Sequence, residues 1–145
     1  MIKAILTDNS IASTSSDAFT LYEKSSYGDK RANKIEYSHI ESLFLVNENK
    51  MTVFYNNKKI DESSLLNKLK KTDKKIDLKL IVYRDLRKKG YILKGALKFG
   101  AEFRVYEKGV KPGVEHAKWI LTIVKETDSV NWHEFAAKNR IAHST

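Results

Sequence analysis

The chain has 145 residues, of which 41% are hydrophobic, and it carries a formal net charge of +9. This length allows one ordinary domain or two small ones with a buried core. With no cysteine and four scattered histidines that lack ligand spacing, we expect no disulfide, no metal centre and no other cofactor. No apolar run approaches a membrane span and the first residues do not resemble a signal peptide, so we expect a cytoplasmic protein with no membrane partner.

The positive charge is uneven along the sequence. Residues 1–79 contain 14 Lys and Arg against 11 Asp and Glu, whereas residues 80–145 contain 13 against 7. A polyanion such as a nucleic acid is the natural partner for this excess, because each phosphate that a cation neutralises releases counterions. The alternative is a lysine-rich, solvated surface with no such partner, and charge alone does not decide between the two.

The first elements are short and separated by polar sequence. Residues 2–6 and 19–23 are rich in strand formers, and the polar run 7–17 joins them. Residues 25–33 contain many turn formers and predict a loop.

A capping box predicts the start of the next helix. Ser38 and Glu41 have the spacing at which the serine accepts from the third helical amide and the glutamate reaches back. Turn and cap residues then predict the following elements: a helix over 40–46, a strand over 51–55, a tight turn at Asn56–Asn57, and a helix over 62–71 capped by Asp61.

The run KKTDKK at residues 70–75 is the predicted domain boundary, because it is charged and lies between two helical patterns. The alternative is a surface turn within one domain. A second long helix is predicted over 76–89, and Gly90 ends it because glycine takes the left-handed cap without steric cost.

Strands dominate the prediction for the remaining residues. The strand over 116–124 is apolar on both faces, which is typical of a central strand covered on two sides. Asn131 and Glu134 have capping-box spacing and predict a helix to about Arg140. The other elements expected are strands over 91–99 and 102–106 and a loop closed by Lys111-Pro112-Gly113.

Tyr106 and His116 are the residues with the clearest capacity for proton transfer. They flank a glycine- and proline-containing loop in the basic half of the chain, so a tight connection would place both on one rim of a sheet. A histidine titrates near neutral pH and serves as a general acid, whereas a tyrosine acts as a base only where a nearby cation lowers its pKa from about 10. Taken singly, each residue is more often structural than catalytic.

Four short sequence words stand out in this part of the chain: YRDLRKKGY (83–91), KFGAEFRVY (98–106), GVKPGVEHA (109–117) and RIAHS (140–144). In their order and spacing they resemble the C-terminal nuclease domain of archaeal tRNA-splicing endonucleases. Residues 27–69 also look like the small N-terminal domain of those enzymes.

The resemblance implies an α/β fold of the α+β kind in two parts. It implies a small mixed N-terminal domain over 1–73. It further implies a nuclease-like C-terminal domain over 74–145, with a central mixed sheet flanked by helices.

The resemblance also implies the reaction: cleavage of precursor tRNA at bulge–helix–bulge junctions, without a metal, by attack of a ribose 2′-hydroxyl on the adjacent phosphate. The products are a 2′,3′-cyclic phosphate and a 5′-hydroxyl. Tyr106 aligns with the proposed general base and His116 with the proposed general acid. Arg140 aligns with an arginine that stacks on a bulged base.

Further cations flank this site and are candidate phosphate ligands: Arg104, Lys108 and Lys111. The alternative for these three is a solvated loop, and for Arg140 it is a cation favoured at a helix C-terminus.

One expected residue lies outside the sequence. In the family a lysine that stabilises the transition state follows the RxAHS word, and on that pattern it would be the second residue after Thr145. We therefore expect a fragment, a truncated product or half of a split enzyme, in which a second subunit supplies the closing strands. The complete protein is expected to form a homodimer or homotetramer. The competing hypotheses are a non-catalytic structural or RNA-binding subunit and a generic basic RNA-binding module.

Overall fold

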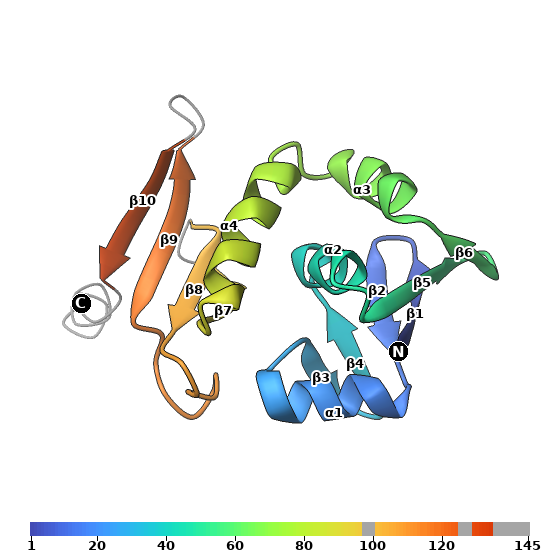
Figure 1. The fold of residues 1–145 in the computed structure, drawn as a ribbon, viewed down its shortest axis with the longest axis horizontal. Coiled ribbons are helices and arrows are strands. Elements are labelled where there is room, and N and C mark those ends of the chain that lie inside the picture. The colour runs from blue at the N-terminus through green and yellow to red at the C-terminus, as the bar shows by residue number, and fades with distance from the viewer. Residues whose placement is uncertain (97–100, 125–128, 135–145) are drawn as a thin grey trace. The chain divides into compact units, whose positions relative to one another are not determined.

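A computed structural model of the chain describes residues 1–96, 101–124 and 129–134. It divides into two compact units, Met1–Arg84 and Asp85–Thr145. Helices and two separate sheets confirm the α+β class (Figure 1). Among the described residues, no helix is long and apolar enough to cross a bilayer.

The first unit is built on a six-stranded mixed sheet in the order β3-β4-β2-β1-β5-β6. The β1–β5 pair is parallel and the other pairs are antiparallel. Burial alternates strictly along β1, so one face of this strand is covered and the other is solvated. The strands are β1 (Ile2–Thr7), β2 (Ser10–Ser13), β3 (Asp29–Arg31), β4 (Lys34–Tyr37), β5 (Met51–Tyr55) and β6 (Lys58–Ile60).

Helices α1 (Ser16–Ser25), α2 (His39–Asn47) and α3 (Glu62–Lys70) belong to the same unit. Helix α1 packs on β1 and β4, and α2 packs on β4, β5 and α3. Their apolar side chains meet those of the strands in a core whose largest fully buried members include Ile2, Leu6, Ile11, Ile35, Leu43, Leu45, Leu65 and Leu69.

The predicted caps are confirmed. The Ser38 side chain accepts from the Glu41 amide, and the Glu41 side chain accepts from the Ser38 amide at 3.0 Å, which completes the capping box. The Asp61 side chain accepts from the Ser64 amide at 2.7 Å at the start of α3. Asn56 and Asn57 both have positive φ, 52° and 64°, as a two-residue hairpin turn requires.

The strand predicted over 19–23 is wrong, because these residues lie in α1. Phe, Thr and Tyr in this segment favour a strand, but the unit covers its sheet here with a helix, and Ala18 of that helix is fully buried. Asp17 in the first turn adds a favourable charge at the helix N-terminus. Strands β2 and β3 also occupy parts of the segments predicted as a polar connection and a loop.

Helix α4 (Ile76–Lys88) confirms the predicted long helix. The division between the compact units falls inside it, after Arg84, and not at 70–75. Tyr83 is 1% exposed and meets the Phe44 ring edge-on at 5.3 Å, which ties the first turns of α4 to the first unit. The domain limits 1–73 and 74–145 stay a prediction.

The second unit contains the last turn of α4 and a sheet in the order β10-β9-β8-β7, whose described strands all pair antiparallel. A mixed sheet was expected here, but the described strands of this unit form only antiparallel pairs. The sheet that contains a parallel pair, β1 with β5, belongs to the first unit. The interior position predicted for the apolar strand is confirmed, because β9 pairs on both sides. The strands are β7 (Ile92–Gly95), β8 (Phe103–Tyr106), β9 (Trp119–Val124) and β10 (Ser129–Glu134).

The helix predicted from Asn131 is wrong for residues 131–134, which belong to β10. Six consecutive pairs join β10 to β9, from Ser129↔Val124 to Glu134↔Trp119. This ladder supplies backbone hydrogen bonds that a local capping pattern cannot match. Residues 135–140 of the predicted helix lie outside the described residues.

Candidate active site

Tyr106 is the last residue of β8 and lies opposite Ile92 of β7. It is 3% exposed and belongs to a buried cluster that also contains Ile92, Ala117 and Ile120. The sheet therefore fixes the position of the tyrosine through packing on two neighbouring strands.

The loop 107–118 connects β8 to β9 and folds into two turns. The Val110 amide donates to the Glu107 carbonyl at 3.2 Å, and the Val114 amide donates to the Lys111 carbonyl at 3.1 Å. Gly113 has a φ of +93°, a left-handed conformation that favours glycine. The loop closure predicted at residues 111–113 is confirmed.

His116 is exposed in this loop, and the strand predicted to begin there begins three residues later, at Trp119. The change matters because a loop residue is not held by a backbone ladder. Its neighbour Ala117 is 4% exposed and packs in the same cluster as Tyr106. The two candidate proton-transfer groups are thus attached to one cluster, Tyr106 directly and His116 through the next residue.

Lys118 closes the base of the loop. Its amide donates to the Val105 carbonyl at 2.8 Å, and its ammonium lies 2.8 Å from the Glu107 carboxylate. Both partners of this ion pair are nearly half exposed, so it contributes less than about 1 kcal/mol. The same ammonium lies 4.9 Å from the centre of the Trp119 ring.

An aromatic pair, Tyr91 with Trp119, lies next to the end of this loop and was not predicted from the sequence. Tyr91 and Trp119 meet edge to face, with ring centres 5.7 Å apart. The Lys108 ammonium lies 5.6 Å from the centre of the Tyr91 ring, and the Lys108 stem covers Gly90. Tyr91 and Trp119 are 28 positions apart in the sequence, and only the register of β7, β8 and β9 brings them together.

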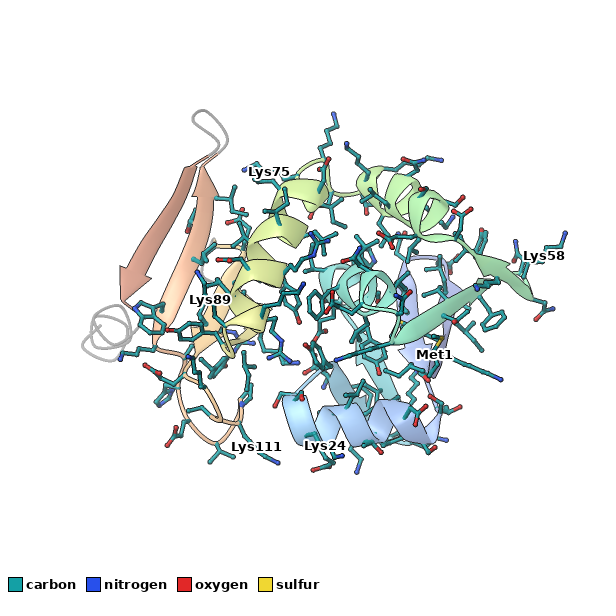
Figure 2. The ribbon with its side chains drawn as sticks, in the orientation of Figure 1. Met1, Lys24, Lys58, Lys75, Lys89 and Lys111 are labelled. Carbon is teal, nitrogen blue, oxygen red and sulfur yellow. The ribbon has the colours of Figure 1, made fainter. Side chains whose placement is uncertain are left out.

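The remaining predicted cations lie in different surroundings. Arg104 is half-buried on β8, and its Nε donates to the Gly95 carbonyl at 2.7 Å. Lys111 is exposed on the loop between β8 and β9 (Figure 2). Arg140 lies outside the described residues.

Two sequence models of one family match the chain. The model described as "tRNA intron endonuclease, N-terminal domain" matches residues 1–66. The model described as "tRNA intron endonuclease, catalytic C-terminal domain" matches residues 76–145. The chain belongs to the tRNA intron endonuclease family. The second match contains Tyr106, His116 and the whole loop between them.

Relatives within this family are named tRNA-splicing endonuclease. The chain is 33% identical to the one from Pyrococcus abyssi over 144 residues, which cover 99% of this chain and 82% of that relative. It is 40% identical to the one from Nanoarchaeum equitans over 112 residues, which cover 73% of each. The Methanothermobacter thermautotrophicus relative is 33% identical over 123 residues, covering 85% of this chain and 71% of that relative.

Proposed function

We propose that the chain is a tRNA-splicing endonuclease that cuts precursor tRNA at bulge–helix–bulge intron junctions. The observation that carries this proposal is the match to both domains of the family in their order along the chain. The matched segments also support a small N-terminal domain over 1–73 and a catalytic domain over 74–145. The net charge of +9 suits an RNA substrate.

In this proposal Tyr106 removes the proton from a ribose 2′-hydroxyl, and that oxygen attacks the adjacent phosphorus. The bond from phosphorus to the 5′-oxygen breaks, and His116 donates a proton to that oxygen as it leaves. The products are a 2′,3′-cyclic phosphate and a 5′-hydroxyl. The shared cluster that holds Tyr106 and Ala117 supports this pairing of roles.

Cations around the loop serve as phosphate ligands in the proposal. Lys108 and Lys111 are exposed, and Arg104 lies two residues before Tyr106 on the same strand. Arg140 is proposed to stack on a bulged base. Self-association into a homodimer or homotetramer, or assembly with a second subunit, is also proposed, and sedimentation of the purified protein tests it.

One observation favours a different role. Tyr106 is only 3% exposed and packs among apolar side chains, as a purely structural tyrosine would. In a non-catalytic RNA-binding subunit, neither its hydroxyl nor the imidazole of His116 would affect cleavage by a partner.

Two substitutions separate these functions. Tyr106→Phe keeps the packed ring and removes only the hydroxyl, and His116→Ala removes the imidazole from an exposed position. For a catalytic base and acid we expect each to lower the cleavage rate of a precursor tRNA transcript by about 10²- to 10⁴-fold. RNA affinity, measured by fluorescence anisotropy, should stay within about 2-fold.

Val114→Ala is the matched control, because Val114 is 80% exposed in the same loop and carries no proton-transfer group. It should cleave at the wild-type rate. Full cleavage by both Tyr106→Phe and His116→Ala would refute the catalytic proposal and favour the non-catalytic subunit.

A further inference from the structure

Lysines gather on one segment of the first unit. Residues 1–57 contain six Lys and Arg against seven Asp and Glu, whereas residues 58–75 contain seven lysines against three acidic residues. A uniformly lysine-rich surface would not produce this contrast. The positive charge of this unit is therefore concentrated on β6, α3 and the connection to α4.

A surface hollow of 380 Å³ lies within this segment, between the β5–β6 hairpin and the first turn of α3. Tyr55, Lys58 and Lys59 line it from the hairpin, and Asp61 and Ser64 line it from the helix. The hairpin turn places Tyr55 directly opposite Lys58 in the strand register. The hollow thus lies between two features that the sequence predicts, the Asn56–Asn57 turn and the capped start of α3.

The lysines at this hollow are available to a ligand. Within the part of the chain that the structure describes, Lys58, Lys59 and Lys68 form no ion pair. Lys58 and Lys59 are exposed, and Figure 2 shows Lys58 at the hairpin, far from Lys24 on α1. The Lys68 ammonium lies 4.3 Å from the centre of the Tyr55 ring, a cation–π contact that holds a third charge beside the hollow.

Asp61, the acidic residue in the lining, offsets only part of this positive charge. The Asp61 carboxylate accepts the Ser64 amide at 2.7 Å, and this hydrogen bond from the backbone lowers the pKa of Asp61. The carboxylate is therefore engaged at the N-terminus of α3, and the helix end is already capped. Lys58 and Lys59 of the hairpin therefore supply the positive charge that would attract an anion into the hollow.

We propose that this hollow, with Lys58, Lys59 and Lys68, binds phosphates of the RNA substrate away from the scissile bond. The inference rests on the proposed function, and it adds to that function a second RNA-binding surface on the N-terminal domain. Phosphate backbone is the ligand that unpaired lysine ammonium groups favour, and such contacts position an RNA without reading its sequence. A protein partner would require an apolar centre, whereas the apolar residues of the lining are only Tyr55 and Ile60.

The double substitution Lys58→Ala with Lys59→Ala tests the proposal in the full chain. Anisotropy titrations with a precursor tRNA transcript at several salt concentrations give both the affinity and its salt slope. Loss of two phosphate contacts should reduce the slope of log K against log salt by about 1.4 to 1.8. From that slope we expect affinity to fall about 15- to 30-fold at about 0.15 M salt. In cleavage assays KM should rise by a similar factor, while kcat stays unchanged.

The matched control is Lys24→Ala with Lys34→Ala, which removes the same charge from exposed lysines of the same unit outside residues 58–75. It should lower affinity by less than about 3-fold. Equal losses in the two double variants would overturn the proposal, since they would indicate only a general charge effect. An unchanged RNA affinity of the Lys58→Ala, Lys59→Ala variant would also overturn it. If that variant instead had a lower oligomeric state than the wild type, the hollow would be assigned to binding a second copy of the chain. Failure of the wild-type protein to bind the transcript at all would refute the proposed function itself.

Discussion

Glu41 offers a direct test of how the first unit is held together. This carboxylate is 3% exposed, and both of its oxygens accept hydrogen bonds. The Gly28 amide donates to Oε2 at 2.7 Å, and the Ser38 amide and hydroxyl donate to Oε1 at 3.0 and 3.1 Å. One side chain thus joins the start of α2 to the loop before β3. Glu41→Gln keeps the shape but replaces one acceptor oxygen by a donor.

The expected cost follows from this geometry. Whichever way the glutamine amide turns, its NH₂ group faces a backbone N–H, so at least one charge-assisted hydrogen bond is lost and a buried donor is left without an acceptor. A hydrogen bond to a charged group contributes about 1.5–3 kcal/mol, and an unsatisfied buried donor costs about 1–3 kcal/mol. Because these terms overlap, we expect the free energy of unfolding to fall by about 2–4 kcal/mol.

Urea unfolding followed by far-UV circular dichroism measures this loss, and amide hydrogen exchange at Gly28 reports the bond itself. Glu36→Gln is the control, because Glu36 lies on β4 and takes part in no such network with the residues that the structure describes. It should change stability by less than about 0.5 kcal/mol. Equal stability of the two variants, with undiminished protection of the Gly28 amide, would refute the reasoning.

Three further predictions concern stability. Burial, and then the charge of Glu41, raises the pKa of Tyr37. The contribution of the protonated tyrosine to the free energy of unfolding is therefore complete below about pH 10 and is lost as the pH rises further. The Tyr37 hydroxyl has no hydrogen-bond partner among the described groups, so Tyr37→Phe should change the free energy of unfolding by less than about 1 kcal/mol at pH 7. Urea titrations at about pH 9 to 12 should show that the variant loses less stability with rising pH than the wild type. Asp61→Ala removes the α3 cap and should lower the melting temperature measured at neutral pH. Gly28→Ala should prevent stable folding, because its Cβ would overlap with the Ile35 side chain. Gly109→Ala, which faces open space, should cost only about 1–2 kcal/mol from its positive φ, and melting curves distinguish the two.

Part of the candidate site could be predicted from the sequence because its residues are close along the chain. The loop from Tyr106 to His116 is short, and its turns follow from Lys111-Pro112-Gly113 and the neighbouring residues. The burial of Tyr106 could not be predicted in this way. It depends on Ile92 and Ile120, which reach the tyrosine only when three strands have paired. The same pairing brings Tyr91 to Trp119.

The sequence by itself determined the features that are set by residues three or four positions apart. The capping box of Ser38 and Glu41, the Asp61 cap and the Asn56–Asn57 turn are of this kind, because their hydrogen bonds close within one turn of backbone. Only the tertiary structure decided that residues 19–23 are helical and that residues 131–134 form a strand. In both segments the local preference is weak, and burial against the sheet or pairing with β9 supplies more free energy than propensity does.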